Sequence, residues 1–163
     1  MDNPLDKWPD AIHESGHAAA ACSFNWPIRE VSIQALKTSP SDRVGVCQLA
    51  IDALPDETQE DLVRSMIYWA GGPAAEFLLD IETSPAAVAT DYLEIRKRAV
   101  RAFPHDRRAQ EAMMRRGEEA AFEMVRQYRS GIKALAAALM RLGRVEGPTA
   151  ERVLHGAANV LHP

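Results

Sequence analysis

The sequence predicts an α+β domain that is mostly helical and carries a small β-sheet or hairpin. Apolar side chains recur at three- and four-residue spacing over most of the chain, as they do on the buried face of a helix. Only residues 30–51 show the alternation of apolar and polar residues that is typical of strands. Apolar residues make up 47% of the 163 residues, and no internal repeat or low-complexity linker divides them. We therefore expect one domain over residues 1–163.

The first fifty residues are expected to form a helix followed by two strands. The helix should cover Ala11–Phe24 with Asp10 as its N-cap, because the alanine run favours a helix and an aspartate can accept hydrogen bonds from its first free N–H groups. Pro27 should end this segment. Glu30–Leu36 and Val44–Ile51 then have the strand pattern, and the Ser-, Pro- and Asp-containing residues between them predict a turn or loop. A hairpin or a pair of neighbouring strands follows from this arrangement.

The middle of the chain is expected to hold two helices in succession. Asp56 should open the first and form a capping box with Gln59. The adjacent Gly71 and Gly72 should interrupt this helix, because glycine is a poor helix former. Pro73 can then begin the next short helix at its first position, where a missing N–H costs nothing.

The last part of the chain is expected to be almost entirely helical. One helix should run from about Thr90 to Ala102. Asp106 should cap a long helical segment, which Gly131 could break and Gly143 should end. Pro148 should start a short terminal helix.

Charge, cysteine content and hydropathy argue against several classes of protein. A net charge of −4 argues against a nucleic-acid-binding protein, which usually has a basic face. The two cysteines, Cys22 and Cys47, do not form a disulfide framework and suit a reducing cytoplasm. The acidic, proline-containing start of the chain is unlike a signal peptide, and no apolar run reaches the roughly 20 residues of a membrane span. We expect a cytoplasmic protein with no membrane span in this chain.

The motif that indicates chemistry is His13-Glu14-Ser15-Gly16-His17, which has the pattern H-E-x-x-H within a predicted helix. Residues four apart lie on one helix face, so both imidazoles can reach one ion. Catalytic zinc sites combine three protein ligands with one water, and Glu14 can accept a proton from that water, whose pKa the metal lowers. Roughly one chain in a hundred of this composition would contain the pattern by chance. The sequence therefore predicts a zinc centre with Glu14 as the general base.

Such a centre needs a third ligand, which the motif does not identify. The extended motif of metzincin peptidases would place a histidine six residues after His17, where the chain has Ser23, so that class is excluded. The remaining acids are Glu76, just after the GGPAA segment, and Asp91, at the start of a predicted helix. An acid in a first helical turn also complements the helix dipole, so each position has an ordinary structural explanation. Periodicity alone leaves both acids open.

Three segments of the chain match a known family in order. They are HESGHA at residues 13–18, GGPAAE at residues 71–76, and TD at residues 90–91, before a helix. At this spacing they resemble the peptidase domain of FtsH-type ATP-dependent zinc proteases, which carries HEAGHA, GGRxAE and an S-N-D segment. Weaker matches occur at residues 30–33, 129–143 and 145–147. The resemblance covers nearly the whole chain.

The resemblance implies a zincin-like metallopeptidase fold and a specific set of site residues. It makes His13, His17 and Asp91 the zinc ligands, with Glu14 as the general base. It makes Glu76 an acid that orients a ligand imidazole, as partners of metal-bound histidines commonly do. Residues 1–103 then form the portion with the metal site, and residues 104–163 form a C-terminal helical bundle.

The chain departs from this family mainly by what it lacks. It contains no G-x-x-x-x-G-K-[ST] phosphate loop, so we expect no ATPase motor and no ATP binding in these residues. Ser15 and Pro73 differ from the family's usual residues, but neither is a ligand. A separate unfolding machine, or association with further copies of this chain, could serve such a peptidase.

Three functions are compatible with these patterns. The leading prediction is a zinc endopeptidase that hydrolyses unfolded or flexible polypeptides. The second is a phage-type regulatory peptidase that cleaves one specific repressor. The third is a non-catalytic interaction domain stabilised by zinc, which Glu14 argues against because a structural zinc site needs no base.

Overall fold

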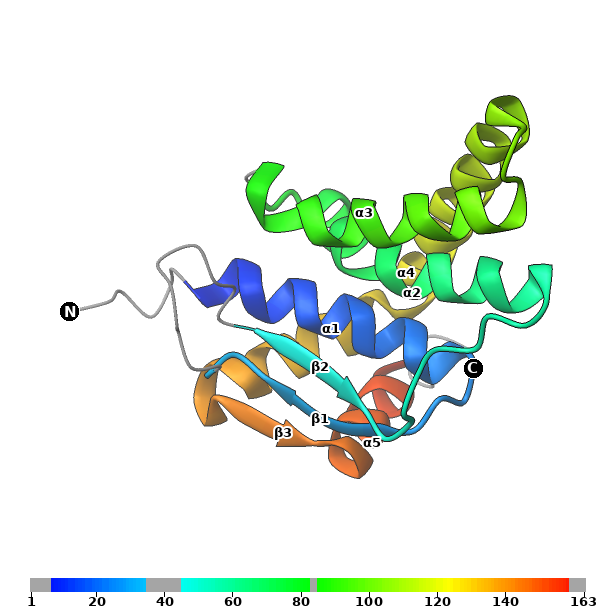
Figure 1. Cartoon of the computed structure of the whole chain (residues 1–163). Coiled ribbons are helices and arrows are strands. Elements are labelled where there is room, and N and C mark those ends of the chain that lie inside the picture. Colours follow the sequence, from blue (N-terminus) through cyan, green and yellow to red (C-terminus); the bar gives the residue numbers. More distant parts are fainter. Residues whose placement is uncertain (1–6, 35–44, 83–84, 159–163) are drawn as a thin grey trace.

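Helices and a small antiparallel sheet make up the part of the chain that the computed structural model describes, residues 7–34, 45–82 and 85–158 (Figure 1). The α+β prediction is confirmed in this respect. The predicted turn at residues 37–43 lies outside the described residues. In chain order the elements are α1 (Trp8–Ser23), β1 (Ile28–Ser32), β2 (Val46–Leu49), α2 (Gln59–Leu78), α3 (Pro85–Ala102), α4 (Arg107–Leu142), β3 (Arg144–Glu146) and α5 (Gly147–Ala158).

The sheet has the strand order β2-β1-β3, with all neighbours antiparallel. Val31 in β1 lies opposite Cys47 on one side and Val145 on the other. Strands β1 and β2 correspond to the two predicted strands, although β1 begins at Ile28 and ends at Ser32. Strand β3 was not predicted, because three residues are too few to show an alternating pattern.

Helix α1 is the central element of the fold. It lies between the sheet and α2 and also packs against α4 (Figure 1). Every residue from Ala11 to Cys22 is buried, and the alanines at 18–21 are completely inaccessible. A helix that is covered on all sides is typically buried in a core, and small side chains let its neighbours come close.

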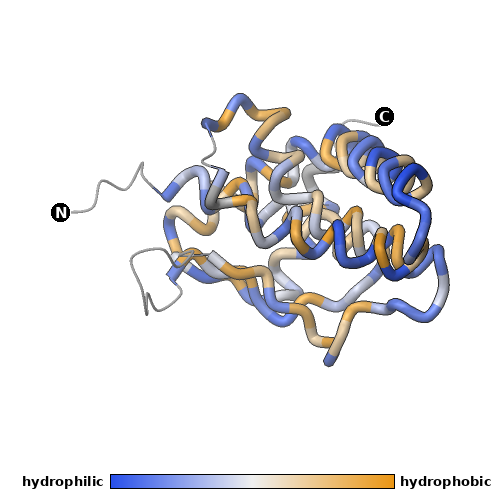
Figure 2. The backbone as a smooth tube through the Cα atoms, turned by 45° about the horizontal axis from the view of Figure 1, so that its top comes forward, coloured by the Kyte–Doolittle hydropathy of each residue, from blue (hydrophilic) through white to orange (hydrophobic). Residues whose placement is uncertain are grey.

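Helices α3, α4 and α5 are amphipathic. Hydrophobic and hydrophilic residues alternate along them (Figure 2), so one face of each is buried and the other meets solvent. Helix α2 has no exposed residue from 65 to 76, where it packs against α1 and α4. Within the described residues, no helix is both long enough and apolar enough to cross a membrane.

The caps of the first two helices differ from the predicted ones. Helix α1 begins at Trp8 after Lys7, with no capping side chain, and the predicted cap Asp10 lies in its first turn. The prediction was wrong because Pro9 already suits the first turn of a helix. The capping box of α2 is Thr58 and Asp61 rather than Asp56 and Gln59. The Thr58 hydroxyl accepts from the Asp61 N–H at 3.1 Å, and the Asp61 carboxylate accepts from the Thr58 N–H at 3.1 Å.

Three predicted helix breaks or starts are also wrong. Helix α2 continues through Gly71, Gly72 and Pro73, because its packing against α1 and α4 outweighs the one helical hydrogen bond that a proline removes. Helix α4 continues through Gly131, where a Cβ would lie 2.7 Å from the carbonyl oxygen of Leu154, so this glycine lets α5 approach closely. Helix α3 begins at Pro85, well before the predicted start.

The predicted ends of α4 are confirmed. The Asp106 side chain accepts a hydrogen bond from the Ala109 N–H at 2.9 Å, as an N-cap does. Gly143 follows the helix with φ 72°, the left-handed conformation that favours glycine at a helix C-terminus.

Candidate metal centre

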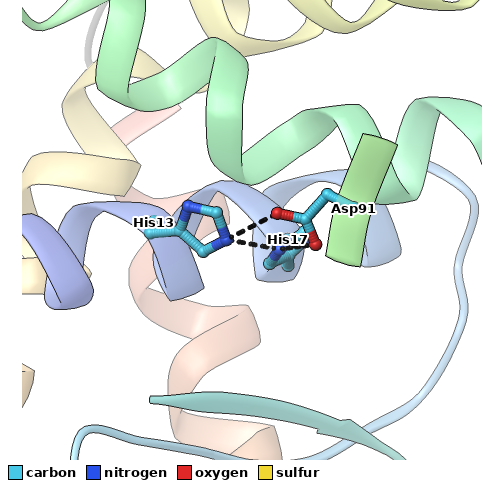
Figure 3. A group of neighbouring side chains, drawn as sticks. All are labelled: His13, His17 and Asp91. Atoms are coloured by element: carbon cyan, nitrogen blue, oxygen red, sulfur yellow. Dashed lines mark hydrogen bonds and ion pairs between the residues drawn. The ribbon is translucent and has the colours of Figure 1, made fainter. Parts of the chain in front are cut away.

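Two helices bring three potential metal ligands together. His13 and His17 lie one turn apart on α1, and their Nε2 atoms are 2.9 Å from each other. Asp91 reaches them from α3 (Figure 3), with Oδ2 3.2 Å from Nε2 of His13 and Oδ1 3.6 Å from Nε2 of His17. All three side chains are buried, with 2–4% of each residue exposed.

The separations of these donor atoms fit a single ion. A tetrahedral zinc ion with bonds of about 2.0–2.1 Å holds its ligand atoms roughly 3.3 Å apart. The two Nε2 atoms are 2.9 Å apart, and the two oxygens of Asp91 lie 3.2 Å from one and 3.6 Å from the other, close to that value. Imidazole nitrogen and carboxylate oxygen are also donors that first-row divalent metals accept. This buried His-His-Asp group could therefore hold a metal ion.

Helix α2 fixes the orientation of both imidazoles. Nδ1 of His17 lies 2.8 Å from the Tyr68 carbonyl oxygen, and Nδ1 of His13 lies 3.1 Å from Oε1 of Glu76. When each Nδ1 carries the proton, His17 donates to the Tyr68 carbonyl oxygen and the His13 imidazole lies beside the Glu76 carboxylate. The lone pair of each Nε2 then faces the shared space beside Asp91. This tautomer is the one a metal ligand needs. The structure places the Glu76 carboxylate beside Nδ1 of His13, and its role in orienting a metal ligand remains a prediction.

Glycines on α1 and α2 allow α2 to lie close to α1 and its two histidines. Helices α1 and α2 meet backbone to backbone, since a Cβ on Gly16 would lie only 2.3 Å from the carbonyl oxygen of Gly71. A Cβ on Gly72 would lie 2.5 Å from Nε2 of His13 and 2.7 Å from Nε2 of His17. The glycine pair that was expected to break the helix instead provides the space in which the imidazoles lie.

Glu14 lies between α1 and the start of β2. It is 4% exposed, and a Cβ on Gly45 would lie 2.7 Å from its Oε1, so the carboxylate rests against backbone at that point. The Tyr68 hydroxyl donates to the Cys47 carbonyl oxygen at 3.1 Å and so joins β2 to α2 beside the site. Burial, and then the negative charge of Glu14, raises the pKa of the Cys47 thiol. This cysteine therefore stays protonated near neutral pH and packs as a small apolar residue.

The position of Asp91 differs from the predicted one. It lies inside α3, six residues (85 to 91) after the helix begins, and not in a first turn. Glu76 likewise lies near the end of the long α2 and not in a short helix begun by Pro73. Both acids thus project sideways from helices, and α3 presents Asp91 to α1 by packing on α2.

Sequence reasoning missed the residues that shape the site. Tyr68 contributes through its backbone carbonyl, which carries no signal in the sequence. Gly16 and Gly72 were visible as small residues, but their close contacts depend on how two distant helices cross. Trp69 stands edge-on to His17, with ring centroids 6.1 Å apart, and the Arg98 guanidinium lies over the Trp69 ring at 5.6 Å. These contacts connect α3 to the histidine helix.

A larger surface hollow lies elsewhere. It measures about 660 Å³, lies where the start of α2 faces α4, and includes Val63, Phe103 and Met113 but none of His13, His17 and Asp91. Its size does not make it the functional site, because the donor atoms converge in the buried group and not there.

No known family model matches this chain, and no curated protein matches its sequence at a significant level.

Proposed function

We propose that this chain is a zinc-dependent endopeptidase with a zincin-like fold, similar to the peptidase domain of FtsH-type proteases, and that it acts on unfolded or flexible polypeptides. The meeting of His13, His17 and Asp91, with a buried Glu14 next to His13 in α1, is the observation that supports this proposal most strongly. Three protein ligands leave one coordination position for water or substrate, which is the arrangement of catalytic zinc sites. A structural site would have no use for a glutamate in the position of Glu14.

Each residue of the site has a distinct role in this proposal. When bound, zinc supplies Lewis-acid chemistry, because it polarises a peptide carbonyl and lowers the pKa of water. His13, His17 and Asp91 would hold it. Glu14 accepts the proton of the attacking water and can return it to the leaving amine. Glu76 and the Tyr68 carbonyl keep the two imidazoles in the tautomer that leaves Nε2 free to bind metal.

An open sheet edge supports an extended polypeptide as the substrate. Among the described residues, β2 pairs only with β1, and its other edge forms no strand pair there; we infer that an extended polypeptide could add to this edge as a further strand. Gly45 immediately precedes β2 and touches Glu14, so a chain bound along this edge would pass close to the general base. Only a segment that is already unfolded or flexible can adopt this extended form.

The test combines metal removal with one substitution. The zinc-loaded chain should cleave unfolded casein, lose this activity with a chelator and regain it when zinc is restored. Glu14→Gln should keep zinc and fold but lose at least about 100-fold in turnover, because an amide cannot accept the proton. Glu119→Gln, an exposed glutamate on α4, is the matched control and should be fully active. Unchanged turnover in Glu14→Gln would refute the role of Glu14.

The depth of the site favours a second candidate, a non-catalytic domain that uses the metal for stability. The ligands are as inaccessible as core residues, at 2–4% exposed. A zinc-loaded chain that cleaves no unfolded polypeptide, and unfolds when zinc is removed, would support this alternative. Cleavage of one particular protein, with none of casein, would instead indicate a regulatory peptidase.

A further inference from the structure

A small pocket with aromatic walls lies between α2, α3 and α4, lined by residues other than the metal-binding group. Its volume is about 110 Å³, and Phe77, Tyr92 and Phe122 line it together with Glu118. We propose that this pocket binds the cationic side chain of an arginine or lysine presented by a polypeptide. This proposal is independent of the proposed peptidase function.

The aromatic rings are unusually accessible for residues of their size. Phe77 is 71% exposed and Tyr92 is 49% exposed, while Phe122 is partly buried. The Phe77 and Phe122 rings pack together with centroids 5.5 Å apart, and Tyr92 lines the same pocket from α3. The faces of such rings are negative and attract cations that come within about 6 Å of the ring centre.

The charged residue in the lining is an acid. Glu118 is half-buried, and its burial raises the pKa of its carboxyl group. Within the described residues it forms no ion pair with a lysine or arginine. A partly desolvated carboxylate is stabilised when a cation approaches, so the charge of the pocket complements a cationic ligand.

A neighbouring hollow extends the same surface. It shares Pro73, Phe77 and Tyr92 with the pocket and continues to Val88 on α3. Elsewhere in the described structure, arginines of this chain already stack on rings, Arg64 on Phe24 and Arg98 on Trp69. No arginine stacks in this way on the described rings of the pocket, which leaves them accessible to an external cation.

The size of the pocket favours a side chain over a larger ligand. A volume of about 110 Å³ equals roughly that of three to four waters, which suits a guanidinium or ammonium group with part of its stem. Arginine should bind better than lysine, because a planar guanidinium can stack on a ring and donate two hydrogen bonds to one carboxylate.

The test is a titration of the full chain followed by NMR of its aromatic and backbone groups. The probes are N-acetyl-arginine N-methylamide, the corresponding lysine compound, and N-acetyl-citrulline N-methylamide, which has nearly the shape of arginine but no charge. Arginine should shift the signals of Phe77, Tyr92 and Phe122 in a saturable way, with lysine weaker. Citrulline should bind about 5- to 10-fold more weakly than arginine, because it lacks the cation–π and carboxylate attractions.

Two adjacent glutamates provide the matched variants. Glu118→Gln should weaken arginine binding about 5-fold and leave citrulline unchanged, a modest factor because the carboxylate is only half-buried. Glu119→Gln makes the same change one residue away, at an exposed position outside this pocket, and should bind arginine normally. Phe77→Leu, at a position too exposed to endanger the fold, should also weaken arginine binding.

Several results would overturn the proposal. They are equal binding of arginine and citrulline, equal effects of the two glutamine variants, and the absence of any saturable shift. Shifts of the same rings that depend on protein concentration alone would also overturn it, since the pocket would then be a contact between copies of this chain.

Discussion

The helix that carries the histidines and the longest helix of the fold are held in place in different ways. Helix α1 is buried on all sides from Ala11 to Cys22 and meets its neighbours through alanine, glycine and backbone atoms. Helix α4 has 36 residues, buries a stripe of residues spaced three or four apart, and exposes charged side chains between them. A substitution on α1 therefore has little space in which to relax, whereas the outer face of α4 should tolerate change.

The largest effect should follow from removing both histidines of α1. The double variant His13→Ala with His17→Ala should lose zinc affinity by roughly a thousandfold or more, because two of three ligands are gone. Zinc content measured by plasma mass spectrometry after dialysis checks this. His105→Ala, at an exposed position between α3 and α4, is the control and should keep one zinc per chain. Full zinc occupancy in the double variant would show that the metal binds elsewhere.

The size of the loss in zinc affinity should distinguish Asp91 from Glu76. Asp91 faces both Nε2 atoms, at 3.2 and 3.6 Å, whereas Glu76 faces Nδ1 of His13, at 3.1 Å. Asp91→Ala should therefore lose zinc almost as severely as a histidine variant. Glu76→Ala should retain measurable zinc, with affinity lowered about 10- to 100-fold, as for other groups that orient a metal ligand. Competition with a fluorescent zinc chelator measures both affinities, and the reverse order would exchange the roles of the two acids.

Close packing around the site predicts a smaller but distinct effect on α2. Gly72→Ala places a Cβ 2.5 Å from His13 and should displace the imidazoles. Overpacking of this kind costs about 1–3 kcal/mol of stability, and zinc affinity should fall with it. Gly156→Ala on α5 is the control, because its Cβ meets no atom within 4 Å. That variant should be unchanged or more stable by up to about 1 kcal/mol. Equal thermal shifts for the two variants would contradict the packing argument.

The smallest effect on stability should come from removing the N-cap of α4. Asp106→Ala removes the side chain that accepts from the Ala109 N–H and should cost about 1 kcal/mol of unfolding free energy. Asp106→Asn keeps an equivalent cap and should cost almost nothing. Zinc affinity should be unchanged in both, since the cap is remote from the site. A zinc effect comparable to that of Gly72→Ala would show that α4 and the metal centre are coupled more tightly than their packing indicates.

The same contrast explains how much of the fold the sequence could predict. The ends of α4 were predicted from Asp106 and Gly143, because caps act locally and leave a signature in neighbouring residues. The continuity of α2 could not be predicted from its glycine pair. Whether two glycines break a helix or let another element approach depends on Gly16, more than fifty residues earlier in the chain.

The candidate site was also predictable only where its residues are neighbours in the sequence. His13 and His17 are neighbours on one helix, so their spacing alone predicted a shared ion. Asp91 and Glu76 could be ranked only by resemblance, because their distances to the histidines depend on how α2 and α3 pack on α1. The Thr58–Asp61 capping box is different, since its T-x-x-D signature is local and can be found in the sequence.

Anomalous diffraction at the zinc edge, from crystals of the zinc-loaded chain, tests the metal centre most directly. The structure predicts one strong peak between α1 and α3. It should lie about 2.0–2.2 Å from Nε2 of His13, Nε2 of His17 and an oxygen of Asp91. Glu76 should remain against Nδ1 of His13. A peak bound by Glu76 with Asp91 turned away, or no peak among these residues, would contradict the proposed centre.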